Sequence, residues 1–357
     1  MTKGISGLRI VSIGGGTGLS TLLSGLKSYV GAEDPESDSI ETLTAVVTVT
    51  DDGGSSGRLR EEFQILPPGD IRNCMVALAE DEHLLTRLFQ YRFESDGDLS
   101  GHSFGNIFVA ALAGVTGDFL EAIKVSSEVL AIKGRIYPST TEDVTLLAEV
   151  EDGRIIQGET RIVNSRSRIK RLSLSRTDCQ PLPETLEAIK QADIITIGPG
   201  SLYTSLIPNL LVNGIVDAIN NSAALKMYIC NIMTQPGETE GFTIEDHLRV
   251  LFEYSPQLQL DYAIANSTLV NEASREKYLA DGAVQVEFKA EPLPGTPAEQ
   301  VLSVGIEAGS EQAIRVIREG LLNENGLVRH DPQKLARLLL KIHRAERTAA
   351  RSTSNRQ

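Results

Sequence analysis

Residues 8–18 of the chain read Leu-Arg-Ile-Val-Ser-Ile-Gly-Gly-Gly-Thr-Gly, and the fold follows from this stretch. Residues 8–13 are a short apolar run rich in β-branched side chains, which is typical of a buried strand. The run ends in glycines, and leucines then recur at helical spacing over residues 19–26. A second apolar run covers residues 43–50. Together these segments predict strand, helix and strand, the unit that builds parallel sheets.

The same alternation returns in the second half of the chain. A helix over residues 183–192 is expected before an apolar strand at 194–197, and further strands are expected at 227–233 and 260–265. Between residues 132 and 176 the pattern is that of β-strands, with Asp152-Gly153 as a two-residue hairpin turn. We therefore predict an α/β protein with a Rossmann-like, doubly wound, mostly parallel sheet that carries an inserted antiparallel β element.

Capping residues predict where several helices begin. Asp70 follows a Pro-Pro-Gly turn, Asp118 and Thr243 are each followed by an acidic residue three positions later, and Asp331 precedes a proline. The last helix is expected to end near His343. These signals predict a single domain over residues 1–345, with the inserted β element at about 132–176, and a flexible basic tail over residues 346–357.

Composition restricts the class of protein and its partners. The formal net charge of −14 argues against nucleic acid as the main partner, because binding to a phosphate backbone needs a dominant positive field. The 3 cysteines form no CxxC pair and are expected to be free thiols in a reducing compartment. No signal-peptide layout or apolar run of about 20 residues is present, so we expect a cytoplasmic protein without a membrane span.

Two basic stretches run against the acidic balance, and we interpret both as solvated faces. The first comprises Arg161, Arg166, Arg168, Lys170, Arg171 and Arg176, and the second comprises Arg337, Lys341, Arg344, Arg347, Arg351 and Arg356.

Three predicted strands end in loops of small residues, at 14–18, 51–57 and 198–201. In an open parallel sheet, ligands bind outside the carboxyl ends of the strands, where the order of the strands reverses. Glycines let the backbone approach a phosphate, and the first turn of the next helix supplies free N–H groups. A single such loop is equally explained as a tight turn that needs positive φ. Three loops at one sheet edge favour phosphate binding.

The type of loop excludes two familiar nucleotide sites. Leu19 stands where the dinucleotide fingerprint would have its third glycine, and the Gly-Lys-Ser/Thr of a P-loop is absent. We therefore expect neither NAD nor flavin as a cofactor, and no ATP hydrolysis of the P-loop type.

Asp51 and Asp52 close the second predicted strand and leave three interpretations open. They could accept hydrogen bonds from ribose hydroxyls, hold Mg²⁺ beside a diphosphate, or form only a polar turn. Asn106 begins a predicted helix, where it could cap the helix or contact the ligand, and His102 could bind phosphate or its own loop. Three arginines that flank the acidic loop could clamp a phosphate or pair with nearby glutamates: Arg58, Arg60 and Arg72. Three polar residues after a later strand suit a base or sugar: Asn231, Thr234 and Gln235.

Six motifs in order resemble the gluconeogenesis-factor (YvcK-like) family, which is related to 2-phospho-L-lactate transferase (CofD-like). They are IGGGTGLSTLLSGLK, TVTDDGGSSGRLR, PPGDIRNC, GHSFGN, IGPGSLYTSLIPNLL and CNIMTQPGET, and the later HDPQKLARLLL also fits. The resemblance implies a Rossmann-like core, a cytoplasmic location, and a role in central carbon use and cell shape. It also implies binding of a UDP-sugar such as UDP-N-acetylglucosamine. In the transferase branch the same loops hold a guanine nucleotide, and an acid at the end of the second strand helps to bind Mg²⁺.

Carried onto this chain, the resemblance assigns the nucleotide site to the strand-end loops, and we add Asn106 to that set. The predicted nucleotide-binding residues are Gly14, Gly15, Gly16, Thr17, Gly18, Asp51, Asp52, Asn106, Gly198, Gly200, Ser201, Leu202, Tyr203 and Thr204. Asp51 and Asp52 are also the predicted Mg²⁺ ligands. The favoured function is a regulatory, homo-oligomeric protein that senses a nucleotide-sugar and signals to a protein partner. The alternative is a Mg²⁺-dependent transferase of a phosphate-containing group, although no clear deazaflavin site is visible.

Overall fold

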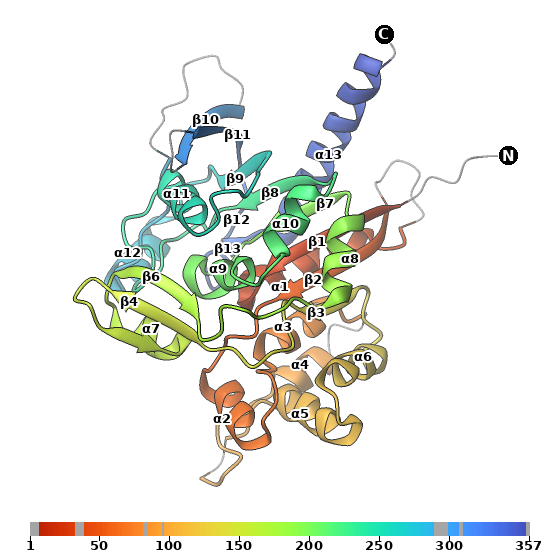
Figure 1. Cartoon of the computed structure of the whole chain (residues 1–357), viewed down its shortest axis with the longest axis vertical. Helices are drawn as coiled ribbons and strands as arrows, with labels where there is room; N and C mark the ends of the chain where they lie inside the picture. The colour runs from red at the N-terminus through yellow and green to blue at the C-terminus, as the bar shows by residue number, and fades with distance from the viewer. Residues whose placement is uncertain are drawn as a thin grey trace, which may run out of the picture.

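A computed structural model describes residues 7–32, 39–80, 84–94, 96–288, 299–306 and 310–354. Its main feature is an eight-stranded sheet with the order β10-β11-β9-β8-β7-β1-β2-β3 (Figure 1). The strands are β1 (Leu8–Gly14), β2 (Ile40–Val47), β3 (Arg135–Pro138), β7 (Ile194–Ile197), β8 (Leu225–Ile229), β9 (Tyr262–Asn266), β10 (Glu299–Ile306) and β11 (Ser310–Glu319). All neighbours pair in parallel except β10 and β11.

The sheet is doubly wound, as the sequence predicted. From β1 the chain adds β2 and β3 on one side, then returns to β7 on the other side and continues outward through β8, β9 and β11. The order of the strands therefore reverses between β1 and β7. A crevice at the carboxyl ends of these two strands is the usual place for a ligand in such sheets.

Helices cover both faces of the sheet, and each face has its own apolar core. Ile10 of β1 packs with helices α1 (Gly16–Leu26), α3 (Gly69–Leu78) and α13 (Pro332–Ser354). Its neighbour Val11 packs on the opposite face with α8 (Pro183–Gln191), α10 (Ile215–Asn221) and α11 (Ile244–Tyr254). Successive side chains of a strand point to opposite faces, so one apolar run serves both cores.

Further helices, turns and short strands lie outside the main sheet and the inserted element. They are α2 (Gly54–Phe63), α4 (Leu84–Gln90), α5 (Phe104–Thr116), α6 (Phe119–Val129), α9 (Ile207–Leu210), α12 (Glu272–Ala280), a 3₁₀ turn at Lys27–Tyr29, a π-helical turn at Leu202–Leu206, and strands β12 (Leu322–Asn323) and β13 (Arg329–His330). Two predicted caps are confirmed: the side chain of Asp118 accepts from Glu121 N at the start of α6, and Thr243 and Asp246 form a capping box on α11.

The inserted antiparallel element is confirmed, but it is smaller than predicted. It consists of β4 (Leu146–Val150), β5 (Ile155–Gln157), β6 (Ile169–Leu174) and the short helix α7 (Glu159–Ser165). β4 pairs antiparallel with both β5 and β6, and Gly153 takes φ +85 in the hairpin turn. Residues 135–138, which we had assigned to the insert, instead form β3 of the main sheet. Ile136 pairs in parallel with Ala45 of β2, a long-range contact that local β-propensity does not reveal.

The end of the last helix was predicted wrongly. Asp331 caps α13 as expected, because its Oδ1 accepts from Lys334 N at 2.9 Å. The helix then continues past His343 to Ser354. Residues 344–354 contain mainly alanine and arginine, which are strong helix formers. Glu346 also connects this part of the helix to the main sheet. Its carboxylate accepts a hydrogen bond from the Tyr262 hydroxyl at 2.6 Å and forms an ion pair with Arg315.

Among the described helices, none is by itself both long and apolar enough to cross a membrane. The segments Leu202–Leu210 and Ile215–Asn221 pass that test only as a pair, with a 75° bend between them.

Candidate functional site

The first and third glycine loops lie side by side at the carboxyl ends of β1 and β7. A Cβ atom on Gly18 would come within 2.5 Å of the Pro199 carbonyl oxygen, so the two backbones are in direct contact. Both loops line one cavity of about 360 Å³, which we call the glycine-loop cavity. It lies where the order of the strands reverses. Its walls include Gly15, Gly16, Thr17, Gly18, Gly200 and Ser201.

The start of helix α1 gives this cavity an anion-binding character. The N-cap is Gly15, which provides no side-chain hydrogen bond, and the first turn carries no acidic residue. The positive end of the helix dipole therefore faces the cavity, although the N–H of Gly16 already donates to the carboxylate of Asp70. Gly16 takes φ +60, a conformation that side chains disfavour.

The loop after β8 closes the other side of the cavity with polar groups. Asn231 Nδ2 donates to the Gly200 carbonyl oxygen at 2.8 Å, and Gln235 Nε2 donates to Ser201 Oγ at 2.7 Å. These contacts tie the third glycine loop to the loop that follows β8. Tyr278, Arg329 and His330 also line the cavity, and the sequence analysis missed all three because they lie on distant elements.

Five of the predicted nucleotide-binding residues are buried in the interior and do not line this cavity. Gly14 and Gly198 lie under the loops, and a Cβ atom on Gly198 would be 2.7 Å from the Ile229 carbonyl oxygen. The segment 202–204 turns inward as a buried π-helical turn: Leu202 joins the apolar core, Tyr203 packs against Phe242 and Tyr254, and Thr204 is buried. A loop sequence does not reveal where its chain turns inward.

Asp51 and Asp52 are adjacent in sequence but face different neighbours. Asp51 Oδ1 accepts from Gly53 N at 2.8 Å, and its carboxylate is also bonded by Ser56. Asp52 Oδ1 accepts from Thr160 N at 2.8 Å, at the start of α7 in the inserted element. β2 ends at Val47, earlier than predicted, so both aspartates belong to the loop. Through this hydrogen bond, Asp52 connects the loop after β2 to the inserted element.

Asp70 is a site residue that the sequence analysis placed wrongly as a helix cap. The N-cap of α3 is Pro68, and Asp70 lies within the first turn. Its carboxylate accepts from the Gly16 N–H, and a Cβ atom on Gly15 would be 2.5 Å from its Oδ2. Burial, with a further contribution from Asp51, raises the pKa of Asp70 to about 7. An acid directly after the Pro-Pro-Gly turn was the available signal.

A second cavity, the α2 cavity, lies beside the first turn of α2 and has a volume of about 280 Å³. Its walls include Asp51, Asp70, Asn106, Arg72 and Arg92. Asn106 is not the cap of α5, because Ser103 Oγ accepts from Asn106 N at 3.2 Å. Asn106 Nδ2 donates to Ser56 Oγ at 3.3 Å, while its buried Oδ1 has no hydrogen-bond partner within the described part of the chain.

Two further carboxylates lie below the third glycine loop. Glu238 accepts from Tyr203 N at 3.2 Å and from Thr204 Oγ1 at 3.3 Å, and burial raises its pKa to about 7. Glu159, at the start of α7, also accepts from Thr204, and burial raises its pKa well above the ordinary value, with Asp51 and Asp70 adding to the rise. No group of three or more His, Cys, Asp or Glu side chains with metal-binding geometry occurs among the described residues.

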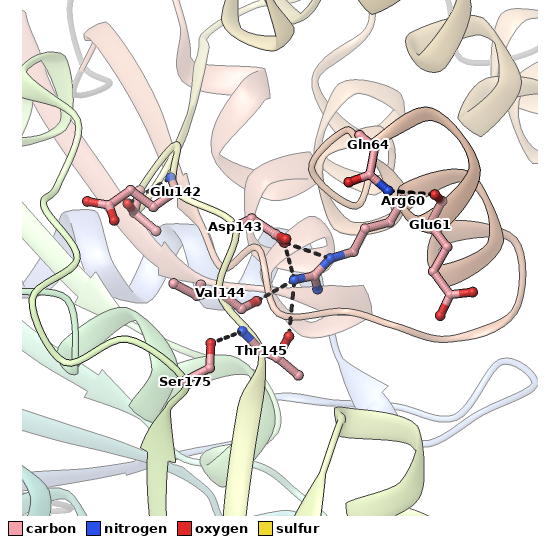
Figure 2. A network of polar contacts seen from close by, with 9 residues as sticks. Arg60, Glu61, Gln64, Glu142, Asp143, Val144, Thr145 and Ser175 are labelled. Carbon is pink, nitrogen blue, oxygen red and sulfur yellow. Dashed lines mark hydrogen bonds and ion pairs between the residues drawn. The ribbon is translucent and has the colours of Figure 1, made fainter.

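The other polar residues that flank the acidic loop are engaged in packing α2. Arg60 points from α2 to the base of the insert, where its Nη2 donates to the Val144 carbonyl oxygen at 2.7 Å and its Nε donates to Asp143 at 3.0 Å (Figure 2). Arg58 Nη2 donates to the Ser100 carbonyl oxygen at 2.6 Å, and His102 Nδ1 lies 3.0 Å from Ser55 Oγ. Of the three predicted arginines, Arg72 lines the α2 cavity.

Comparison with known proteins identifies the family. The family model of 2-phospho-L-lactate transferase CofD matches residues 10–304. A protein from Nostoc named putative gluconeogenesis factor is 47% identical over 338 residues, which cover 94% of this chain and 68% of that protein. The gluconeogenesis factor of Bacillus subtilis is 44% identical and is covered over 98% of its length. A crystal structure of a UPF0052 family member from Bacillus halodurans superposes with a TM-score of 0.80 at 41% identity, and it covers 94% of this chain and 100% of its own. On these matches, this chain belongs to the gluconeogenesis-factor family, within the wider family of 2-phospho-L-lactate transferase CofD.

Proposed function

We propose that the protein is a regulatory protein that binds a nucleotide-sugar of the UDP-N-acetylglucosamine type in the glycine-loop cavity. The observation that carries this proposal is the direct contact of two glycine loops at the point where the order of the strands reverses. The cavity of about 360 Å³ has the size of a small-molecule site.

The diphosphate of such a ligand fits over the first turn of α1. Thr17 and Gly18 present backbone there, and Gly200 faces them from the other loop. The uracil and sugar groups would then meet the polar side chains of Asn231 and Gln235 and the guanidinium of Arg329. These groups supply both donors and acceptors, as a base and a hydroxylated sugar require.

The positions and hydrogen bonds of the acidic groups favour a regulatory role over catalysis. We assign this role to gluconeogenic carbon use and cell shape. Asp52 and Glu238 each accept from a backbone N–H group, and neither lines the glycine-loop cavity. Relatives with the name gluconeogenesis factor match the chain over nearly its whole length. Binding of the nucleotide-sugar would stabilise one arrangement of the loops, and a protein partner would recognise that arrangement.

The donor set of the α2 cavity fits Mg²⁺, and this observation favours the alternative function of a Mg²⁺-dependent transferase. Hard cations prefer oxygen ligands, and Asp51, Asp70 and the unpartnered Oδ1 of Asn106 supply them. The bound cation would neutralise charge on an adjacent phosphate. Asp52 does not belong to this set because it does not line the α2 cavity.

The primary test is isothermal titration with UDP-N-acetylglucosamine. The native protein is expected to bind, and Gly18→Ala is expected to weaken binding strongly because its Cβ would force the two loops apart. Gly97→Ala is the matched control, since a Cβ atom there meets nothing within 4 Å. The proposal is wrong if the folded native protein does not bind, or if both variants bind like the native protein.

A second titration tests the metal. Mg²⁺ is expected to bind the native protein, and Asp51→Asn is expected to abolish that binding, whereas Asp52→Asn should retain it. Equal loss in both variants would contradict the ligand set. The transferase alternative additionally requires Mg²⁺-dependent turnover of a nucleotide donor that Asp51→Asn abolishes, and no turnover with any nucleotide would exclude it.

A further inference from the structure

The inserted element contacts the loops of the glycine-loop cavity through one short helix, α7. The helix has seven residues, and Ile162 is the one among them that is buried. Apolar packing therefore fixes α7 weakly, and its position depends on polar and backbone contacts with neighbouring loops. These contacts come from the loops that follow β2, β7 and β8.

The loop after β8 contains a closed turn, residues 235–239, that extends from the cavity to α7. Thr239 N donates to the Gln235 carbonyl oxygen at 2.8 Å, and Gln235 N donates to Thr239 Oγ1 at 2.9 Å, so the turn is held as one unit. At one end, Gln235 lines the glycine-loop cavity and donates to the third glycine loop. At the other end, a Cβ atom on Gly237 would be 2.6 Å from the Val163 carbonyl oxygen of α7. The closed turn is therefore in direct contact with α7.

The third glycine loop reaches the same helix through Thr204. Ser201 lines the cavity, and its carbonyl oxygen accepts from Ser205 N at 2.9 Å within the π-helical turn. In that turn, Thr204 Oγ1 donates to Glu238 of the closed turn at 3.3 Å and is also hydrogen bonded to Glu159 of α7. One hydroxyl group thus connects two loops of the cavity to the start of α7.

Both ends of α7 depend on contacts with loops. At its start, Thr160 N donates to Asp52 Oδ1 at 2.8 Å. At its end, Arg166 takes φ +48, a conformation that residues other than glycine rarely adopt. A strained residue keeps its conformation only where its surroundings hold it, and the Cβ position of Gly237 is 3.6 Å from Arg166 Cα. The end of α7 is therefore sensitive to the position of the closed turn.

α7 also forms part of the wall of a cavity of about 1030 Å³, which we call the insert cavity. Thr160 and Arg161 line it from α7, while Phe63 lines it from α2 and Ala110 from α5. A shift of α7 therefore changes the shape of this cavity. One short helix thus contacts the loops of the glycine-loop cavity and lines the insert cavity.

We propose that α7 is a relay, through which a ligand in the glycine-loop cavity fixes the inserted element and the shape of the insert cavity. The ligand holds Gln235 and Ser201, and the two turns that begin there contact Val163 and Glu159 of α7. This inference rests on the proposed function, because it assigns the route by which ligand binding reaches a surface that a partner recognises. Such coupling is reciprocal, so a change in α7 also alters the closed turn.

Hydrogen–deuterium exchange of the full chain, followed by mass spectrometry, tests the relay. Saturating UDP-N-acetylglucosamine is expected to slow amide exchange in residues 159–165 about tenfold, the effect of one stabilised hydrogen bond on local opening. Gly237→Ala is expected to bind the ligand in isothermal titration but to lose this slowing, because its Cβ displaces Val163. Gly241→Ala is the matched control: φ is positive at both glycines, and a Cβ atom on Gly241 meets nothing within 4 Å.

A second measurement needs no ligand and uses the reciprocal direction. Glu159→Ala removes the carboxyl that is bonded to Thr204, and it is expected to speed amide exchange in residues 235–239 about tenfold. Glu184→Ala is the control, because it removes an exposed carboxyl from the first turn of another helix, α8. If Gly237→Ala does not fold or does not bind, Glu159→Ala replaces it in the measurement with ligand.

The outcomes separate the relay from the proposed function. Ligand binding without slower exchange in residues 159–165 would overturn the relay and leave the proposed function intact. Slowing that is equal in the relay variant and in its control would do the same. If UDP-N-acetylglucosamine does not bind, the proposed function fails and the measurement without ligand decides: faster exchange in residues 235–239 in Glu159→Ala alone supports the relay, and equal exchange in Glu159→Ala and Glu184→Ala overturns it.

Discussion

Asp70 links helix α3 to the first glycine loop through its carboxylate. It accepts from the Gly16 N–H of the first glycine loop while its own helix α3 carries Arg72 into the α2 cavity. Its burial opposes ionisation, and the adjacent Asp51 adds to that effect. The hydrogen bond that holds the first glycine loop therefore depends on the protonation state of Asp70.

The raised pKa of Asp70 makes a prediction about stability. Its folded pKa of about 7 lies above the ordinary 3.8, so between these values the unfolded state releases a proton that the folded state keeps. The free energy of unfolding should therefore fall as pH rises from about 4 to about 7. Asp70→Asn removes this titration, so its stability relative to the native protein should improve over the same range. Urea denaturation of both proteins at several pH values measures the difference.

The difference between the two proteins removes the contribution of groups that titrate in this range without interacting with Asp70. Glu238 also has a pKa raised to about 7, but it is present in both proteins and cancels in the comparison. A difference that is constant from pH 4 to pH 7 would show that Asp70 has an ordinary pKa.

At the scale of elements, the close crossing of α1 and α13 determines how the chain ends. A Cβ atom on Gly25 would be 2.0 Å from the Pro332 carbonyl oxygen, so the first turn of α13 lies directly on α1. Leu335 and Leu339 then continue the contact into the apolar core on that face. The last helix is thus part of the layer that positions the first glycine loop.

This crossing predicts that Gly25→Ala destabilises the protein. The new methyl group must push α13 away from α1, and overpacking of this kind costs about 1–3 kcal/mol. Gly114→Ala in α5 is the matched control: its Cβ meets nothing within 4 Å, and the better helix propensity of alanine should add up to about 1 kcal/mol. Chemical denaturation of the two variants measures both effects. Equal stability of Gly25→Ala and the native protein would contradict the packing described here.

At the scale of the whole molecule, the sheet joins the two apolar cores. Strand β1 contributes Ile10 to one core and Val11 to the other, and it lies at the reversal point between the two halves of the sheet. A ligand held between the loops after β1 and β7 contacts both halves at once. Binding should therefore stabilise the molecule as a unit.

This linkage predicts a thermal shift with the correct ligand. UDP-N-acetylglucosamine at about one hundred times its dissociation constant should add about 2.7 kcal/mol to the free energy of unfolding. A panel of UDP-sugars, GTP, ATP and NAD, each with and without Mg²⁺, measures the selectivity. A shift for NAD or GTP that equals the shift for the UDP-sugar would contradict the proposed ligand class.

Much of the architecture could be predicted because its signals are local. The apolar run of β1, the glycines after it and the leucines of α1 predict strand, turn and helix without reference to distant residues. The hairpin at Gly153 and the caps at Asp118 and Thr243 were confirmed for the same reason. Strand β3 was assigned to the wrong sheet because a strand's partner depends on long-range contacts.

The amino-acid sequence by itself determined the α/β class, the parallel units and the loops that end the strands, because hydrophobic periodicity and backbone preferences act between near neighbours. Only the tertiary structure decided which loop residues share a cavity: it separated Asp51 from Asp52, turned residues 202–204 inward and brought Asp70 to Gly16. Burial and side-chain direction depend on contacts across the whole chain. The chemistry of a site arises from those contacts.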